Sequence, residues 1–247
     1  MWIPKWLGEI YSGLFLSFET EAFTAPQARE ALTIDSGKLA VAFSKLHSKR
    51  ILTTFKSNRP RTYRLLDPSS FILLTSETAK NIEKIKQERY LPLILKGFWQ
   101  TMKTLHIQSF ALYGSVARGE AKDISDIDIL LVSNDLQGSL GARIEHLSTI
   151  DQALQEELTW LRKQSIHTGL SFYPLKPVEA ERLPSLFLDL TEDAIILYDK
   201  DHFLERLLLE LKARLLKEGA VRVFLDRDRW YWNLKPEYKF GEIVEIP

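Results

Sequence analysis

Residues 113–133 read Tyr-Gly-Ser-Val-Ala-Arg-Gly-Glu-Ala-Lys-Asp-Ile-Ser-Asp-Ile-Asp-Ile-Leu-Leu-Val-Ser, and they hold two polar elements next to apolar runs. Gly114 and Ser115 follow the first run, and Asp126 and Asp128 open the second run after ten further residues. Because successive side chains of a strand point to opposite faces, carboxylates at i and i+2 point the same way. Two like charges held side by side repel each other unless a cation lies between them. The stretch therefore predicts a divalent metal site that faces a phosphate-binding turn.

The order Gly-Ser, ten residues, Asp-x-Asp resembles the signature of the nucleotidyltransferases of the DNA polymerase beta superfamily, and specifically the small archaeal and bacterial minimal nucleotidyltransferases. The four residues named above match it without a gap, in the strand, turn, short helix and strand context that the motif requires. The resemblance implies an α+β domain, with a small mixed sheet flanked by helices. It also implies transfer of a nucleoside monophosphate from an NTP, with ATP as the first expectation, to an acceptor left open. Because some members act as antitoxins that modify a partner toxin, a protein acceptor is one expectation.

Each part of the motif has a chemical role in such a transfer. The two aspartates are expected to hold one or two Mg²⁺ ions, with Mn²⁺ as the alternative, because carboxylate and phosphate oxygens are hard ligands. Gly114 lets the backbone approach a phosphate, and Ser115 offers a hydroxyl and an amide at the start of a short helix. Arg118 and Lys122 lie in the intervening segment, where they either contact the triphosphate or are simply solvated.

The chain departs from the family pattern in one respect. The family generally carries a third carboxylate on a later strand, as metal ligand or general base, whereas residues 166–173 contain no Asp or Glu. Ser171 is the expected position of the lost ligand, and its two neighbours are the alternatives if the strand register differs. Glu179 and Glu181 are the nearest acids downstream. This departure implies slow catalysis, a base supplied by the substrate, or a domain that binds nucleotide without transferring it.

The first seventy residues carry a different pattern. Apolar periodicity predicts a helix over residues 6–18, a capping box at Thr24 starts a second helix, and Ser36 is expected to cap a third. Two β-rich runs, 51–55 and 62–66, follow with a turn-rich loop between them. Three helices followed by a two-stranded hairpin resemble a winged helix-turn-helix domain.

Basic residues concentrate in this same part of the chain. No acidic residue occurs between Ser36 and Leu66, although the net charge of the whole chain is zero. A solvated face normally mixes both signs, so the asymmetry favours a polyanionic partner. We expect duplex DNA, with the third helix in the major groove and the hairpin loop on the backbone or minor groove. A solvated face used for protein contact is the alternative. The residues expected to contact DNA are Lys38, Lys45, Lys49, Arg59, Arg61 and Arg64.

These patterns divide the chain into four parts. They are a winged helix-turn-helix domain (1–70), connecting helices (71–104), a nucleotidyltransferase domain (105–220) and an aromatic C-terminal tail (221–247). In the connecting part, a helix is expected from Thr75 or Ser76 to Arg89, with a restart at Pro92. The tail is expected to pack on the domain or across a homodimer, with base stacking as the alternative. Its aromatic residues are Trp230, Tyr231, Trp232, Tyr238 and Phe240.

Two interpretations of the whole chain follow. The first is a Mg²⁺-dependent nucleotidyltransferase with a DNA-binding N-terminal domain. The second is a winged-helix transcriptional regulator whose degenerate nucleotidyltransferase domain only binds nucleotide or mediates dimerisation. The missing third carboxylate favours the second, whereas the complete Gly-Ser and Asp-x-Asp elements favour the first.

Composition excludes several other classes of protein. With 45% hydrophobic and 27% charged residues, the 247-residue chain is ordinary for a soluble globular protein. It has no cysteine, which excludes disulfides and thiolate metal sites, and its five histidines show no zinc-ligand spacing. No signal peptide and no apolar run near the ~18 residues of a membrane span are present, so we expect a cytoplasmic protein without membrane contact.

Overall fold

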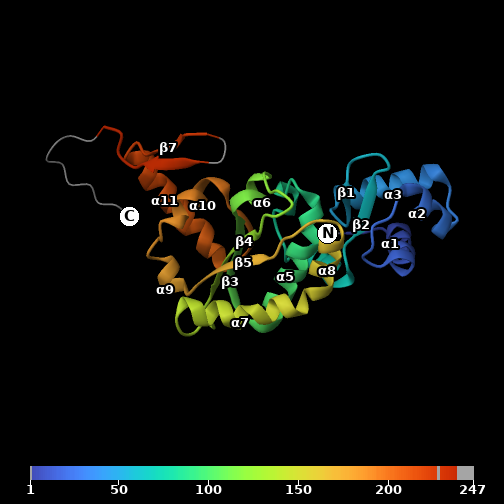
Figure 1. Ribbon diagram of the computed structural model, residues 1–247, viewed down its shortest axis with the longest axis horizontal. Coiled ribbons are helices and arrows are strands. Elements are labelled where there is room, and N and C mark those ends of the chain that lie inside the picture. The colour runs from blue at the N-terminus through green and yellow to red at the C-terminus, as the bar shows by residue number, and fades with distance from the viewer. Residues whose placement is uncertain (1, 227–228, 238–247) are drawn as a thin grey trace.

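The computed structural model describes residues 2–226 and 229–237. Figure 1 shows the N-terminal helices at one end of the molecule, a mixed sheet with its helices in the middle, and the hairpin of β7 at the opposite end. The chain therefore runs along the long axis, from the basic N-terminal part to the aromatic C-terminal part. Within the described residues, no helix combines the length and the apolar character that crossing a membrane requires.

The N-terminal part consists of three helices and an antiparallel hairpin. The predicted capping box is present: the Thr24 hydroxyl accepts from the Gln27 N–H, and the Gln27 side chain accepts from the Thr24 N–H. The predicted cap of the third helix is wrong by one residue, because the Asp35 carboxylate accepts from the first free N–H groups of that helix. The elements are α1 (Lys5–Phe18), α2 (Ala25–Leu32), α3 (Ser36–Ser48), β1 (Leu52–Lys56) and β2 (Thr62–Leu65).

The connecting part differs from its prediction. The helix expected between Thr75 and Arg89 is absent from the described residues, because a helix forms earlier, where Asp67 caps the N–H groups of Ser69 and Ser70. That helix ends at Thr75, and Glu77, with φ of 57°, turns the chain away from helical geometry. The restart at the proline is confirmed, since Pro92 lies in the first turn of α5. The elements are α4 (Pro68–Thr75), η1 (Ile82–Lys84), η2 (Glu88–Tyr90) and α5 (Leu91–Thr104).

A four-stranded mixed sheet forms the centre of the molecule, with strand order β5-β4-β3-β6. The strand β3 pairs antiparallel with both neighbours, and β4 pairs parallel with β5. The apolar runs on either side of the Gly-Ser and Asp-x-Asp elements form the two central strands, which are buried on both faces. The strands are β3 (Ile107–Tyr113), β4 (Ile127–Ser133), β5 (Leu170–Leu175) and β6 (Ile195–Asp199).

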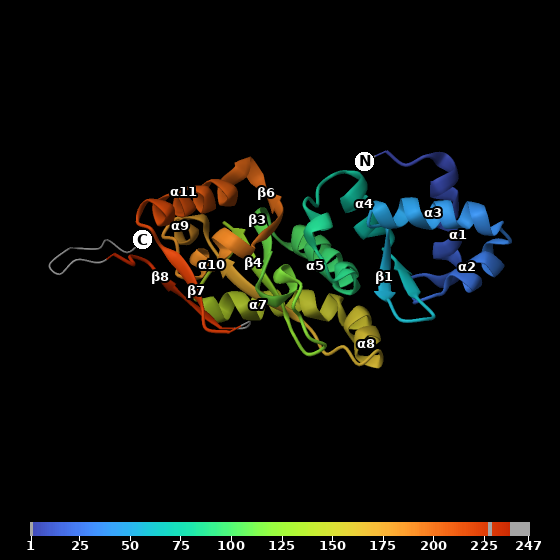
Figure 2. The same ribbon diagram turned by 90° about the horizontal axis from the view of Figure 1, so that it is seen from above.

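Helices cover both faces of this sheet. On one face, Phe110 and Ile129 share a cluster of buried residues with Phe98 of α5 and Leu147 of α7. On the other face, Leu130 belongs to a second cluster with side chains of α10 and α11. Figure 2 shows the sheet between these helices. The remaining elements are α6 (Gly114–Arg118), α7 (Leu140–Ala153), α8 (Gln155–Lys163), α9 (Pro177–Ala180), α10 (Leu186–Asp193), η3 (Lys200–His202), α11 (Phe203–Lys217), β7 (Val221–Phe224) and β8 (Trp230–Asn233).

The described part of the aromatic tail packs back onto the molecule. β7 and β8 form an antiparallel pair, and the indole N–H groups of Trp230 and Trp232 both donate to Oδ1 of Asp189 on α10 (2.8 and 2.9 Å). The hairpin is therefore attached to a helix of the central domain. Tyr238 and Phe240 lie outside the described residues.

A buried ion pair joins the N-terminal part to the central domain. The guanidinium of Arg64 on β2 makes two hydrogen bonds to Glu157 on α8 (2.6 and 3.1 Å), and both side chains are almost fully buried. Lys96 of α5 donates to the same carboxylate, and Trp160 stacks on the guanidinium with its ring centroid 3.6 Å away. Burial alone would raise the pKa of Glu157, but the hydrogen bonds and charges of Arg64 and Lys96 outweigh it and lower that pKa.

Candidate active site

The Gly-Ser and Asp-x-Asp elements meet at one edge of the sheet. Tyr113, the last residue of β3, lies opposite Asp128 of β4, and Gly114 begins α6 directly after it. Gly114 has a φ of 70°, and a Cβ at this position would clash with Oδ2 of Asp128. A side chain is therefore excluded here on two counts, backbone conformation and space. The structure places the backbone of the Gly-Ser turn directly against one of the two carboxylates.

The two aspartates are electrostatically coupled. Asp126 is exposed just before β4, and Asp128 is half-buried within it. Burial, and then the negative charge of Asp126, raise the pKa of the Asp128 carboxyl, while a hydrogen bond from Ser171 and the charge of Arg118 lower it to a smaller extent. Burial and a neighbouring carboxylate thus both disfavour the charged form of Asp128. A cation bound between the two carboxylates would offset this repulsion and stabilise the folded chain.

A third carboxylate approaches this pair from an unexpected element. Asp151 on α7 is half-buried, and its pKa is raised by burial and by the charge of Asp126. Within the described part of the chain, its Oδ1 atom is buried and has no hydrogen-bond partner. The sequence contained a signal for it: Asp151 follows Leu147 by four residues, so the two side chains share one face of α7, and Leu147 is buried.

The donor set fits a hard divalent cation. Among residues 2–226 and 229–237, no three His, Cys, Asp or Glu side chains lie close enough together to hold a metal ion by themselves. Two carboxylates are nevertheless what Mg²⁺ commonly takes from a protein when substrate phosphates and water complete its octahedron. The coupled oxygens of Asp126 and Asp128 supply that pair.

Arg118 and Lys122 lie in different surroundings. The Arg118 side chain donates to Glu120 (2.9 Å), pairs with Asp193 (3.6 Å) and lies over the ring of Trp230 (4.7 Å to the centroid). Lys122 is exposed, and its backbone is bound at both ends, since its N–H donates to Ser125 and its carbonyl accepts from Tyr90. Arg118 therefore lies among side chains of α10 and the β7–β8 hairpin, and Lys122 lies on the surface of the loop before β4.

The strand expected to carry the third carboxylate is β5. Ser171 is the register neighbour of Asp128 across the parallel pair and lies on the same face of the sheet. Glu179, the first acid downstream, is held by two hydrogen bonds from Arg143 (2.5 and 2.8 Å) and one from the Lys176 N–H (2.8 Å). These contacts lower the pKa of Glu179 to about 2, the bonds from Arg143 being the main cause. Glu179 is thus committed to a structural ion pair.

The predicted DNA-contacting residues divide into two groups. Five of them are at least partly accessible, on α3, just after it, or in the loop between β1 and β2. The sixth prediction is wrong, because Arg64 is buried in its ion pair with Glu157 and cannot reach DNA. The accessible residues are Lys38, Lys45, Lys49, Arg59 and Arg61.

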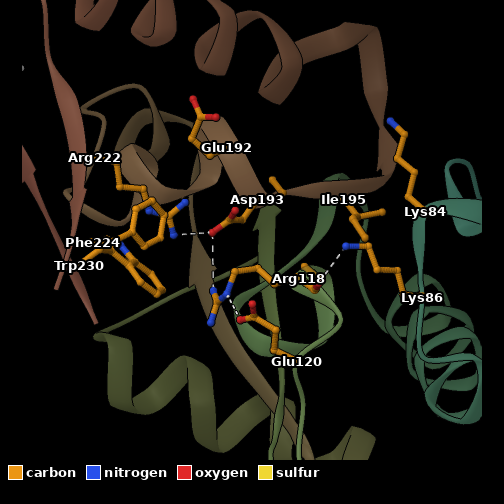
Figure 3. A pocket seen from close by; sticks show the side chains of 12 residues that line it. Lys84, Lys86, Arg118, Glu120, Glu192, Asp193, Ile195, Arg222, Phe224 and Trp230 are labelled. Atoms are coloured by element: carbon orange, nitrogen blue, oxygen red, sulfur yellow. Dashed lines mark hydrogen bonds and ion pairs between the residues drawn. The ribbon is translucent and has the colours of Figure 1, made fainter. Parts of the chain in front are cut away.

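A cavity of about 510 Å³ lies between the C-terminal end of α6, where Ala117 and Arg118 line it, and the start of β6 at Ile195. Figure 3 shows Arg118 and Arg222 turned toward Asp193 between them, with Trp230 beside both guanidinium groups. The cavity is lined by side chains from α6, from the segment before β6, from residues 84–86 and from the β7–β8 hairpin.

A protein-family model matches the middle of the chain. Residues 95–182 match the family model described as a nucleotidyltransferase domain. This range includes β3, α6, β4, α7, α8, β5 and α9, so the match contains the sheet edge described above.

The other comparisons are more distant. One solved chain similar to this one belongs to a structure described as "Crystal structure of the toxin-antitoxin with AMP-PNP". It is 16% identical, with a TM-score of 0.34, and the alignment covers 51% of this chain and 92% of that chain. No curated protein matches this chain.

Proposed function

We propose that this protein is a Mg²⁺-dependent nucleotidyltransferase that moves a nucleoside monophosphate from an NTP, with ATP as the first candidate, to an acceptor hydroxyl. The observation that carries the proposal is the packing of Gly114 against the Asp128 carboxylate, since a turn suited to phosphate and a carboxylate suited to Mg²⁺ then stand side by side. The nucleotidyltransferase match over residues 95–182 supports the reaction class.

In the proposed reaction, the acceptor oxygen attacks the α-phosphorus and forms a new P–O bond. The bond from that phosphorus to the oxygen bridging to the β-phosphate breaks, and pyrophosphate leaves. Asp126 and Asp128 would hold Mg²⁺, which neutralises the charge on the reacting and leaving phosphates when bound. The Gly114 and Ser115 amides and the Ser115 hydroxyl would bind phosphate oxygens.

Neither Tyr113 nor Ser171 can act as the general base that removes the acceptor proton. Burial, and then the charges of Asp128 and Tyr173, raise the pKa of Tyr113 to about 12, so its hydroxyl stays protonated at neutral pH and can only donate or accept a hydrogen bond. Ser171 occupies the place where a general base would stand on β5. We therefore propose that the acceptor proton passes to water and that transfer is slow.

Calorimetric titration tests this proposal. ATP should bind the full chain only with a divalent ion, and Asp126→Asn/Asp128→Asn should lose that binding while keeping the far-ultraviolet circular dichroism of the wild type. Incubation with α-labelled ATP, Mg²⁺ and cell extract should then label a macromolecule, and a labelled protein would agree with a protein acceptor. Equal ATP affinity in the double variant would refute the proposed site.

A second proposed function is duplex DNA binding by the N-terminal part, as a winged helix-turn-helix domain over residues 1–70. It is favoured by the placement of Lys38 and Lys45 on the outer side of α3, whose opposite side is buried, and of Arg59 and Arg61 on the hairpin loop. With Arg64 removed from the set, five basic residues remain. If four or five of them neutralise phosphates, the log–log salt slope of binding should be roughly −3.5 to −4.5.

A gel-shift series with the full chain measures that slope. Lys38→Ala/Lys45→Ala should weaken binding to all sequences and make the slope shallower by about 2. Lys103→Ala, an exposed lysine on α5, is the matched control and should leave both unchanged. If the chain binds DNA but neither ATP binding nor transfer is detectable, the interpretation as a regulator with a degenerate domain replaces the enzyme.

A further inference from the structure

We propose that the cavity beside α6 is the nucleoside site of the transferase, and that the C-terminal β7–β8 hairpin supplies the surface on which the base of the NTP stacks. This inference rests on the proposed function, because it names the part of the same substrate that the aspartates do not contact. It concerns Arg222, Phe224 and Trp230, which lie outside the range matched by the nucleotidyltransferase family model.

The position of the cavity fits a nucleoside whose phosphates lie at the Gly-Ser turn. Ile195, at the start of β6, pairs with Leu112 of β3, and the next residue of β3, Tyr113, pairs with Asp128 of β4. The cavity at the start of β6 and the aspartates at the start of β4 thus flank the same end of β3. Adjacent strands lie about 4.8 Å apart, so the two places are separated by roughly 10 Å. A nucleoside joined to its phosphate spans a distance of this order.

Arg118 connects the two places. It is the last residue of the short helix α6, which begins at Gly114 of the Gly-Ser turn. Its side chain pairs with Asp193 and stacks on Trp230 inside the cavity. A ligand whose phosphates lie at the start of α6 would therefore meet Arg118 and, beyond it, the Asp193, Arg222 and Trp230 side chains that Figure 3 shows around the cavity.

The walls of the cavity contain flat side-chain groups on which a nucleobase can stack. The Arg222 guanidinium lies 4.1 Å from the centroid of the Trp230 ring, and Trp230 is held in place by its hydrogen bond to Asp189. Nucleobases stack on aromatic rings and on arginine guanidinium planes alike. Phe224, whose ring lies 6.2 Å from that of Trp230, is 61% exposed at the rim and so has an open face to offer.

Two carboxylates of α10 hold Arg222 in place. Its side chain is 10% exposed and pairs with Asp193 through Nη2 (2.8 Å). Its Nε atom is buried and lies 3.9 Å from Oδ1 of Asp189. The guanidinium plane is therefore fixed beside the Trp230 ring, where a base can stack on it.

The experiment compares two probes on the full chain: Mg²⁺ with ATP, and Mg²⁺ with inorganic tripolyphosphate, which has the phosphates but no nucleoside. Phe224→Ala should weaken ATP binding by about 5- to 150-fold, the range of one base–aromatic stack, and leave tripolyphosphate binding unchanged. Because the side chain is mostly exposed, its removal should not disturb folding. Tyr231→Ala is the matched control: it removes an exposed aromatic ring from the same hairpin, outside the cavity, and should change neither affinity.

Trp230→Leu provides a second variant for the same prediction. Unchanged ATP affinity in both cavity variants, with ATP still lost in Asp126→Asn/Asp128→Asn, would overturn the nucleoside site and leave the proposed function intact. If the cavity variants bind ATP normally but lose transfer, the nucleoside site is also overturned, because the cavity would then bind the acceptor instead. A wild-type chain that binds neither probe would overturn the proposed function and this inference together.

Discussion

Ser171 lies beside Asp128 across the parallel pair of β4 and β5, and its hydroxyl shares a hydrogen bond with the Asp128 carboxylate. A residue at this position shares the face of the sheet that carries the carboxylates proposed to hold the metal ion. Its neighbours differ: Leu170 is buried, and its side chain packs close to Gly97 of α5. Ser171 is therefore the position at which a third carboxylate would act on the site.

Ser171→Asp should raise Mg²⁺ affinity and, if proton removal limits the reaction, raise transfer by up to about 10²–10⁴-fold. Label transfer from α-labelled ATP and calorimetric Mg²⁺ titration measure the two effects. Ser171→Asn has nearly the same shape without the charge and should show neither gain. If the two variants have the same Mg²⁺ affinity and the same transfer rate, the added negative charge at position 171 has no effect on the site.

Gly114→Ala should abolish ATP binding and lower the stability of the fold. The positive φ alone costs about 1–2 kcal/mol for a residue with a Cβ, and the clash with Asp128 adds to it. Gly8→Ala is the control, because Gly8 lies in α1 with open space around it. That change should stabilise the protein by about 0.5–1 kcal/mol, so urea unfolding of the two variants should move in opposite directions.

Asp151→Asn should raise the melting temperature when no divalent ion is present. Removing this charge relieves its repulsion with Asp126, which we expect to contribute up to about 1 kcal/mol. The stabilisation that Mg²⁺ confers should shrink in the same variant, because one negative charge fewer faces the cation. Glu145→Gln changes an exposed acid of the same helix and should alter neither quantity. A lower melting temperature for Asp151→Asn would mean that its carboxylate makes a stabilising contact.

Glu157→Gln should destabilise the protein by about 3–5 kcal/mol in urea unfolding. The change removes the negative charge between Arg64 and Lys96 and leaves a buried guanidinium uncompensated. Glu156→Gln, one residue earlier and exposed, should have an effect within about 0.5 kcal/mol. Equal stability of the two variants would show that the pair does not hold the N-terminal part to the central domain.

The Arg143–Glu179 ion pair should make stability depend on pH in the acid range. The pKa of Glu179 is lowered from its ordinary value of 4.5 to about 2, so the folded chain binds a proton there less readily than the unfolded chain does. The stabilisation is therefore complete above pH 4.5 and is lost as the pH falls toward 2. Glu179→Gln should lower the melting temperature at pH 7. The difference in melting temperature between the variant and the wild type should disappear near pH 2.

Local patterns in the sequence predicted much of the fold. The Gly-Ser and Asp-x-Asp spacing identified two strands and the turn between them, and the capping box at Thr24 marked a helix start that the structure contains. Such features depend on neighbouring residues alone, through backbone sterics and nearby hydrogen bonds. The prediction of a helix from Thr75 to Arg89 was wrong, because Asp67 caps a helix that starts about two turns earlier and ends at Thr75.

Only the tertiary structure decided which distant groups meet. The sequence placed Arg64 among DNA contacts, whereas its partner Glu157 lies 93 residues away and buries it. It could not place Asp151 near Asp126, nor bring Arg222 and Trp230 beside Arg118, because those encounters depend on how helices cross the sheet and on where the last hairpin returns. The sequence by itself thus determined which residues stand together at the sheet edge, through spacing along one strand–turn–strand unit. Long-range packing determined which charges are buried, which remain accessible, and what surface the substrate would meet beyond its phosphates.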